Sequence, residues 1–321
     1  MTVAYDGQLD PRALKDVVGG TIIGLLETDP DTIYLDADLM SCIATAAYAR
    51  THPHRAIQCG IAEANMIGVA SGLAAAGYKP IAHSFGTFAS RRCFDQVFLS
   101  AGYARNDITV IGSDPGICAS FNGGTHMPFE DMALYRALPT ATVMDISDAT
   151  MLEKVLRQCV NHPGVKYLRV GRKPVARIYG PDSEFPIGKA IPLREGADVT
   201  LAACGIMVAE AMKAAQMLQE EGIQAAVLDM FTVKPVAVET LAAYGQRTGA
   251  IVTAENHNRV GGLYAAVAEA LAGRLLVPVE YVAVEDQFGE VGPQDYLQQR
   301  FGLTAQHIVQ KARKVLERKG R

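Results

Sequence analysis

The chain has 321 residues, of which 49% are hydrophobic and 20% charged, and its 30 basic and 34 acidic side chains give a formal net charge of -4. This composition excludes a mainly disordered chain and leaves room for two hydrophobic cores. Without a basic excess, nucleic acid and anionic membranes are poor candidates as partners. We expect reduced thiols, because the six cysteines form no C-x-x-C pair or zinc-type cluster. The N-terminal residues show no targeting pattern and no apolar stretch is long enough for a membrane helix, so we expect a cytoplasmic protein.

Short apolar runs alternate with segments of helical periodicity in the first half of the chain. The pattern predicts helices near residues 12–27, 62–75, 90–101 and 149–160. It predicts strands at residues 32–35, 79–85, 108–113, 141–146 and 165–170. Uninterrupted apolar strands are typical of a parallel sheet covered by helices on both faces, so the fold class is α/β.

A segment rich in proline, glycine and charge separates this half from a second unit. We predict a first domain at residues 1–180, a linker at 181–198 and a second domain at 199–321. In the second domain we predict a helix at 207–222 and strands at 199–205, 224–230, 249–255 and 279–285, so this domain is also expected to be mostly parallel α/β. Neither a G-x-G-x-x-G after a strand nor a P-loop motif occurs, which disfavours a kinase or a classical dehydrogenase.

The first candidate site residue is Glu63, in the stretch GIAEANMIGVASGLAAAG. Small and apolar neighbours predict that its carboxylate lies on a buried helix face, where it needs a partner because burial penalises the charged form. Phe85 and Phe88 follow a predicted strand at the end where ligand crevices open in parallel sheets. The two rings suit either a wall for a planar ligand or ordinary core packing.

Two further clusters also follow predicted strands. The glycine-containing loop 114–131 offers Asp114, Asn122 and His126 to a small molecule, although a flexible connector would look the same. Arg172 comes after the strand predicted at 165–170, where a guanidinium either clamps an anion or is simply exposed.

The order of these motifs is more specific than any one of them. Six motifs follow one another along the chain: AEANM, SFGTFASRRCFDQ, GSDPGICASFNGGTHMPFEDMALYR, YLRVGRKP, VLDMFTVKP and TAENHNRVGGLYAAVAEAL. Together they resemble the C-terminal two-thirds of transketolase, and related patterns occur in 1-deoxy-xylulose-5-phosphate synthase. The resemblance implies a pyrimidine-binding domain for thiamine diphosphate followed by a transketolase C-terminal domain. The family's diphosphate domain carries a G-D-G motif, which this sequence lacks. The chain therefore resembles the C-terminal subunit of a split transketolase.

The resemblance also implies roles for individual residues. Glu63 matches the glutamate that hydrogen-bonds the aminopyrimidine ring of the cofactor, and is expected to be catalytic. Phe85 and Phe88 match the aromatic wall around that ring. His126 falls where the family has a substrate-facing side chain that hydrogen-bonds donor hydroxyls or moves a proton.

Arg172 and Arg12 match positions that contact the distal anion of the sugar. The sequence departs from the family in the loop, because Phe121 and Asn122 stand where an acidic pair is usual and Asp114 stands where histidine is common. These changes alter which hydrogen bonds the loop would offer to the hydroxyl groups of a sugar. They point away from ordinary pentose phosphates and toward a modified, branched or sulfonated ketose.

Such a subunit would transfer a two-carbon ketol unit from an anionic ketose to an aldose, using thiamine diphosphate and a Mg²⁺ ion bound mainly by its partner. The resemblance predicts an N-terminal partner of about 250–300 residues in an α2β2 assembly that includes homodimerisation, with interfaces of roughly 2,000 Å² or more. Two alternatives stay open. One is a β-type subunit of a 2-oxo-acid dehydrogenase or a synthase-like carboligase, and the other is a non-catalytic regulatory subunit that keeps the fold.

Overall fold

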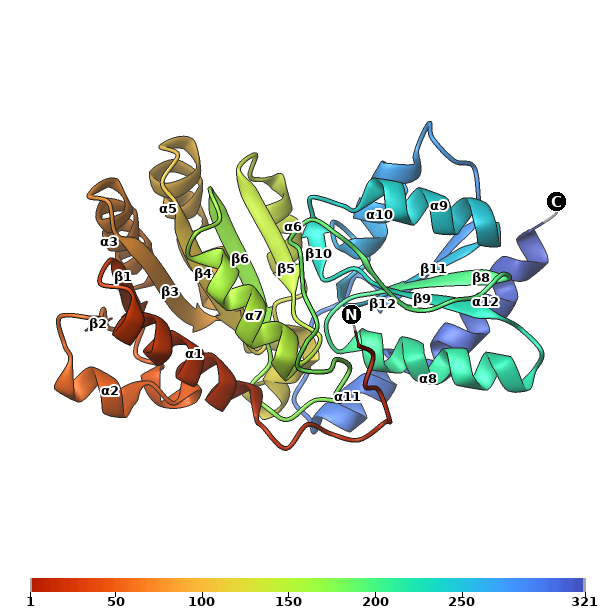
Figure 1. The fold of residues 1–321 in the computed structure, drawn as a ribbon, viewed down its shortest axis with the longest axis horizontal. Coiled ribbons are helices and arrows are strands. Elements are labelled where there is room, and N and C mark those ends of the chain that lie inside the picture. Colours follow the sequence, from red (N-terminus) through yellow and green to blue (C-terminus); the bar gives the residue numbers. More distant parts are fainter. Residues whose placement is uncertain (1, 320–321) are drawn as a thin grey trace.

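The uninterrupted apolar runs form the central strands of two separate sheets in the computed structural model, which describes residues 2–319 (Figure 1). The first sheet has seven strands in the order β10-β5-β6-β4-β3-β1-β2, and the second has five in the order β12-β11-β8-β9-β7. All neighbouring strands are parallel except β10 against β5 and β7 against β9. The predicted fold class, two mostly parallel α/β units, is confirmed.

The first sheet separates two hydrophobic layers. Its strands are β1 (Thr32–Asp36), β2 (Ala56–Gln58), β3 (Lys79–Phe85), β4 (Ile108–Ser113), β5 (Ala141–Asp145), β6 (Val165–Val170) and β10 (Thr232–Lys234). Successive side chains of a strand point to opposite faces, so Tyr34 packs into one core while Ile33 and Leu35 pack into the other. Helices α1 (Leu14–Thr28) and α7 (Ala149–Cys159) cover the first face, and α3 (Glu63–Ala75) covers the second.

The helix predicted near residues 90–101 is broken into short pieces. These are α4 (Gly86–Ser90), η2 (Arg91–Cys93), α5 (Phe94–Gln96) and the π-helical η3 (Val97–Tyr103). The Oγ of Ser90 donates to the carbonyl of Gly86 at 2.6 Å, and the Sγ of Cys93 donates to the carbonyl of Ala89 at 3.3 Å. Small polar side chains that bond the preceding turn in this way bend or interrupt a helix. The remaining elements of this half are η1 (Met40–Ile43), α2 (Ala46–Thr51), η4 (Gly116–Asn122), η5 (Gly124–His126) and α6 (Asp131–Ala137).

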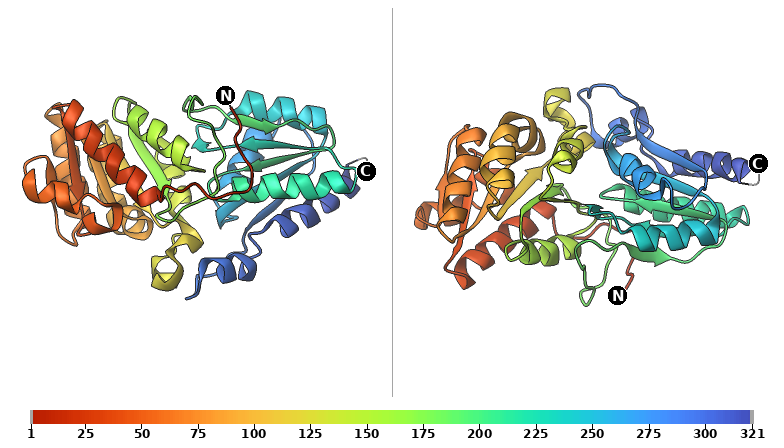
Figure 2. Two further views of the ribbon diagram at one scale, coloured as in Figure 1. Left: turned by 60° about the horizontal axis from the view of Figure 1, so that its bottom comes forward. Right: turned by 90° about the horizontal axis from the view of Figure 1, so that it is seen from above.

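The second sheet has helices on both faces as well. Its strands are β7 (Ile191–Arg194), β8 (Val199–Ala203), β9 (Ala225–Asp229), β11 (Ile251–Asn258) and β12 (Val279–Val284). Its helices are α8 (Met207–Glu220), α9 (Val238–Thr248), α10 (Leu263–Leu271), α11 (Gln294–Arg300) and α12 (Ala305–Arg318). Helices α8 and α12 lie on one face, and α9 and α10 on the other (Figure 2). Strand β7 lies inside residues 181–198, which we predicted as a linker, and the domain division at this segment stays a prediction.

The two units exchange chain segments. Strand β10 follows β9 in the sequence but pairs with β5 of the first sheet, with Thr232 opposite Met144. At the other end, the N-terminal segment runs from α1 toward α8 (Figures 1 and 2), where the hydroxyl of Tyr5 donates to the carbonyl of Ala209 at 3.3 Å. Residues of the second unit therefore lie against the first sheet.

Two sequence expectations concern the surroundings of this fold. All six cysteines are free thiols, of which Cys42 and Cys59 are half-buried and the other four are buried. Between residues 2 and 319, no helix combines the length and the apolar character that a membrane span requires.

Candidate active site

Glu63 is the first residue of α3 and its side chain is buried, with 1% of its surface exposed. Its Oε1 accepts a hydrogen bond from the Oγ of Ser84 at 2.9 Å, and its Oε2 pairs with a guanidinium nitrogen of Arg92 at 2.8 Å. The N-terminus of the helix adds a favourable dipole for a negative charge. The predicted burial of Glu63 is confirmed, and Ser84 and Arg92 are the partners that a buried carboxylate requires.

Three aromatic side chains form a cluster next to this carboxylate. Phe85 ends β3, Phe88 lies in α4, and His126 ends η5. The ring centroid of His126 lies 5.9 Å from that of Phe85 and 5.1 Å from that of Phe88, both in edge-to-face geometry. The centroids of Phe85 and Phe88 are 6.4 Å apart. The structure thus brings together three residues that the sequence predicted separately.

Two arginines extend the aromatic cluster. The Cζ of Arg92 lies 3.9 Å from the ring centroid of Phe88, so this residue contacts both Phe88 and Glu63. The Cζ of Arg172 lies 5.1 Å from the ring centroid of Phe85. A continuous series of contacts therefore runs from Glu63 to Arg172.

Arg172 is held by a carboxylate. Its Nε donates to Oδ1 of Asp114 at 2.9 Å, and its Nη2 lies 2.5 Å from Oδ2 of the same side chain. Burial opposes the charge of the guanidinium, but its hydrogen bond to Asp114 and the negative charge of that carboxylate raise the pKa of Arg172 above its ordinary value. Asp114 is 2% exposed and has a φ of +57°, a left-handed conformation that few non-glycine residues adopt. A pair of this kind leaves one cationic nitrogen for an anion and lowers the net charge of this end of the site.

The other two predicted substrate residues lie outside these contacts. Arg12 precedes α1, where its Nε and Nη2 donate to the carboxylate of Asp10 at 3.0 and 2.9 Å and its Nη2 donates to Thr150 at 3.3 Å. Asn122 ends η4 and is exposed. The structure places Asn122 on the same loop as His126, but it does not bring Arg12 into the cluster.

Sequence reasoning missed several polar residues that fix this region. Beside Ser84, the Nδ1 of His83 lies 2.7 Å from Oδ2 of Asp36, and its Nε2 lies 3.0 Å from the Oγ of Ser113. All three are buried and join the carboxyl ends of β1, β3 and β4. The alternation of His83 and Ser84 along β3 is the signal that could have placed them on opposite faces.

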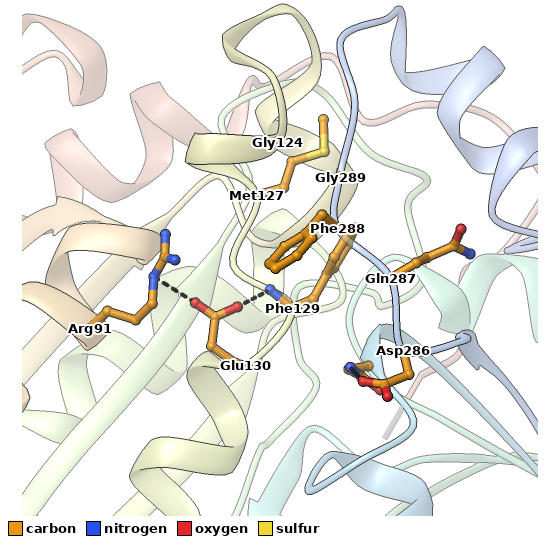
Figure 3. A pocket seen from close by; sticks show the side chains of 10 residues that line it. Arg91, Gly124, Met127, Phe129, Glu130, Asp286, Gln287, Phe288 and Gly289 are labelled. Atoms are coloured by element: carbon orange, nitrogen blue, oxygen red, sulfur yellow. Dashed lines mark hydrogen bonds and ion pairs between the residues drawn. The ribbon is translucent and has the colours of Figure 1, made fainter.

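A cavity of about 310 Å³ opens beside the loop that carries His126 (Figure 3). The Nε of Arg91 pairs with Oε1 of Glu130 at 2.8 Å, and Oε2 of Glu130 accepts a hydrogen bond from the backbone N–H of Phe129 at 2.9 Å. Burial raises the pKa of Glu130. Gly289, from the second unit, closes the cavity against Gly124. Within residues 2–319, no three His, Cys, Asp or Glu side chains form a group that could hold a metal ion.

Comparison with known proteins identifies the family and agrees with the fold. Residues 10–176 match the family model of the transketolase pyrimidine binding domain, and residues 188–308 match that of the transketolase C-terminal domain. The chain is 47% identical over 319 residues to the 6-deoxy-6-sulfo-D-fructose transketolase subunit SqwH of Clostridium sp. (strain MSTE9), covering 99% of both chains. It is 34% identical over 293 residues to a subunit of the apulose-4-phosphate transketolase of Phocaeicola vulgatus, covering 91% of this chain and 94% of that one.

A solved structure described as "Split gene transketolase, inactive beta4 tetramer" matches with a TM-score of 0.88 and 37% sequence identity, covering 96% of this chain and 99% of that chain. Two family models cover most of the sequence in the expected order, and the relatives have the same extent as this chain. The chain therefore belongs to the transketolase family, as a C-terminal subunit of the split kind.

Proposed function

We propose that this chain is the pyrimidine-binding subunit of a thiamine-diphosphate-dependent transketolase that moves a two-carbon ketol unit from an anionic ketose to an aldose. The main support is the contact series from Glu63 through Phe88, His126 and Phe85 to Arg172. It combines a buried carboxylate, aromatic faces and a cation in one place. When bound, thiamine diphosphate supplies the electron sink for cleavage of the carbon–carbon bond.

The residues around Glu63 fit an aminopyrimidine ring. A carboxylate can bind a ring nitrogen and its proton, and aromatic faces suit a flat heterocycle. Arg92 covers both Glu63 and Phe88, but its side chain is 42% exposed, so it can leave both groups without a backbone movement. Its departure would offer the carboxylate and the ring to the same ligand.

In this proposal each side chain of the cluster has a separate task. Glu63 holds the proton shared with the ring, and Phe85 and Phe88 keep water from it. His126 has its Nδ1 2.9 Å from the Oγ1 of Thr125, which leaves Nε2 to hydrogen-bond a substrate hydroxyl and to exchange a proton with it. Arg172 binds the anionic end of the sugar.

The Asp114–Arg172 pair supports a singly charged anion. A phosphate monoester carries about -1.5 to -2 charges at pH 7, whereas a sulfonate carries one, and a neighbouring carboxylate repels the more highly charged group more strongly. The relative from Clostridium is named for a sulfonated ketose. We therefore propose a ketose with a terminal sulfonate as the preferred donor.

The partner of this chain is proposed to be an N-terminal transketolase subunit that holds the diphosphate and Mg²⁺ in an α2β2 assembly. The missing G-D-G motif supports this, and so does the related β-chain tetramer, which is itself described as inactive. The cytoplasmic location inferred from the N-terminal sequence stays a prediction.

Co-expression with a G-D-G-bearing N-terminal subunit tests the proposal. We expect the complex to transfer ketol units from a ketose 6-sulfonate only with thiamine diphosphate and Mg²⁺, and the isolated chain to be inactive. Glu63→Gln should lower kcat at least about 100-fold, because the variant no longer shares an acidic proton. Glu153→Gln, on the exposed side of α7, is the matched control and should leave kcat unchanged.

Other outcomes would overturn the proposal. Full activity in the Glu63→Gln complex would remove the carboxylate from the mechanism. Oxidation of a 2-oxo acid with a lipoyl acceptor would favour the dehydrogenase alternative, and a partner that is fully active without this chain would favour a regulatory subunit.

A further inference from the structure

Asn256 of β11 belongs to the second sheet, but its side chain binds a turn of the first unit. Its Oδ1 accepts a hydrogen bond from the N–H of Ile117 at 3.0 Å, and its Nδ2 donates to the carbonyl of Pro115 at 2.9 Å. Asn256 is 1% exposed. One planar amide thus satisfies a donor and an acceptor of the turn 115–117, which immediately follows Asp114.

The turn is shaped to receive this side chain. Gly116 has a φ of +51°, and a Cβ added there would lie 2.2 Å from Oδ1 of Asn256. The close approach therefore requires glycine at position 116 and a short amide at position 256. On the other side of the turn, the backbone N–H of Asp114 donates to the carbonyl of Val170 at 3.1 Å.

Asn256 is itself held in place by Arg169 of the first unit, a residue that forms two buried ion pairs within that unit. Its carbonyl accepts a hydrogen bond from Arg169 at 2.9 Å, and the guanidinium of Arg169 pairs with Asp131 at 2.8 Å and Asp145 at 2.7 Å. Arg169 and Asp131 are fully buried and Asp145 nearly so. The amide of Asn256 is therefore a fixed support rather than a mobile surface group.

We propose that Asn256 is a positioning residue for the anion-binding end of the site. It holds the turn 115–117 so that Asp114 keeps its left-handed conformation and its carboxylate aligns Arg172. The second domain then sets donor selectivity without touching the donor. This inference rests on the proposed function, which assigns the substrate anion to Arg172.

The test compares Asn256→Ala with Thr253→Val in the full chain and in its complex with the N-terminal subunit. Thr253 is buried on the same strand, and within the described residues its Oγ1 has no hydrogen-bond partner, so its replacement is the matched control. In the full chain, hydrogen exchange of the peptide that contains Ile117 should be about tenfold faster in Asn256→Ala and unchanged in Thr253→Val.

In the complex, two donors separate positioning from general damage. For a ketose 6-sulfonate, Asn256→Ala should raise KM about tenfold, because the anion loses an aligned arginine. For L-erythrulose, which has no terminal anion, KM and kcat should stay within about twofold. Gly116→Ala tests the same contact from the turn if Asn256→Ala does not fold, and should produce the same donor-selective loss.

An equal loss with both donors would overturn the inference, since it would indicate a structural role only. Unchanged exchange at Ile117 would overturn it as well. A wild-type complex that uses neither donor would refute the proposed function instead, while the exchange experiment would still show whether Asn256 holds the turn.

Discussion

Arg92 contacts two groups of the candidate site and is itself partly exposed to solvent. It contacts the carboxylate of Glu63 and the face of Phe88. In the proposed function a ligand takes its place, and both contacts are lost. If Arg92 must move away before the ligand binds, the apparent affinity for the ligand is lower, because only the fraction of molecules with Arg92 displaced can bind it. Arg92 therefore matters for the free chain more than for the loaded one.

The variant Arg92→Met should separate the effect of Arg92 on the stability of the free chain from its effect on cofactor binding. The free chain should lose about 1–3 kcal/mol of unfolding free energy, because the buried carboxylate keeps only Ser84 as a partner. Thiamine diphosphate should bind the complex at least as tightly as it binds wild type. Denaturant unfolding and titration calorimetry measure the two quantities.

Arg157→Met is the control for Arg92→Met, since Arg157 pairs with Glu153 on the surface at 3.6 Å, and its stability should change by less than about 0.5 kcal/mol. Cofactor binding that is tenfold weaker in Arg92→Met than in wild type would show that Arg92 belongs to the cofactor site.

Local sequence patterns were enough to select several residues that the structure brings together, while their roles stay predictions. Glu63 stands out as one acid in an apolar stretch. Phe85 ends a clearly apolar strand, and Phe88 follows it. The pairs Glu63–Arg92 and Asp114–Arg172 join residues 29 and 58 positions apart, so no local spacing reveals them. Arg12 bonds to Asp10 and lies outside the cluster, and this position likewise depends on the tertiary structure.

The loop that carries His126 is held between elements of both units. A Cβ added to Gly124 would lie 2.2 Å from the carbonyl oxygen of Gly289, and one added to Gly123 would lie 2.8 Å from Val291 (Figure 3 shows Gly124 and Gly289). Because the first neighbour is backbone, it has no rotamer by which to move away. The loop and the segment around Gly289 must separate if residue 124 gains a side chain.

Gly124→Ala should therefore displace His126. We expect kcat to fall about tenfold or more, because in the proposed function His126 faces the substrate and a misplacement of about 1 Å is costly. Circular dichroism should show unchanged helix content.

Gly20→Ala in α1 is the control, because a Cβ added there meets nothing within 4 Å. This variant should instead stabilise the chain by about 0.5–1 kcal/mol. Wild-type kcat in Gly124→Ala would show that the loop tolerates the separation.

Long elements with a clear apolar pattern were predicted well, whereas short edge strands were not. The strands predicted at 79–85, 108–113 and 165–170 match β3, β4 and β6, because each is buried on both faces. β2 and β10 have three residues each and β7 has four, too few for a period to show. Pairing with distant strands, and not local propensity, makes them extended.

At the scale of the whole molecule, Asp229 joins the two units. It ends β9, and its Oδ2 accepts hydrogen bonds from the hydroxyl of Ser147 and, at 2.7 Å, from that of Tyr179. Burial raises the pKa of Asp229 to about 7, although both hydroxyls act in the opposite direction. The folded chain therefore keeps a proton here over a pH range in which the unfolded chain has released it.

This linkage predicts a pH-dependent stability. Below about pH 4 the carboxyl is protonated in both states, so its contribution is fully present. It is lost as the pH rises to about 7 and is constant above that, and the total effect is on the order of a few kcal/mol. Asp229→Asn should remove the effect, so the difference in unfolding free energy between wild type and variant should decline from pH 4 to 7. A difference that is flat across this range would refute the assignment.

The two α/β units were predictable from alternating apolar and helical segments, but their interlocking was not. Composition shifts mark residues 181–198 as a boundary, while the contacts of Tyr5 and β10 cross that boundary in both directions. Such contacts depend on the final packing of complete sheets, which no single window of sequence contains.

The position of β10 on the edge of the first sheet has a consequence for recombination between relatives. A chimeric gene joined within residues 181–198 would place a foreign β10 against the native β5. A crossover after residue 234 would keep this strand with the sheet that it completes. A gene segment that encodes the complete first sheet must therefore include residues up to 234, which lie beyond the apparent boundary at 181–198.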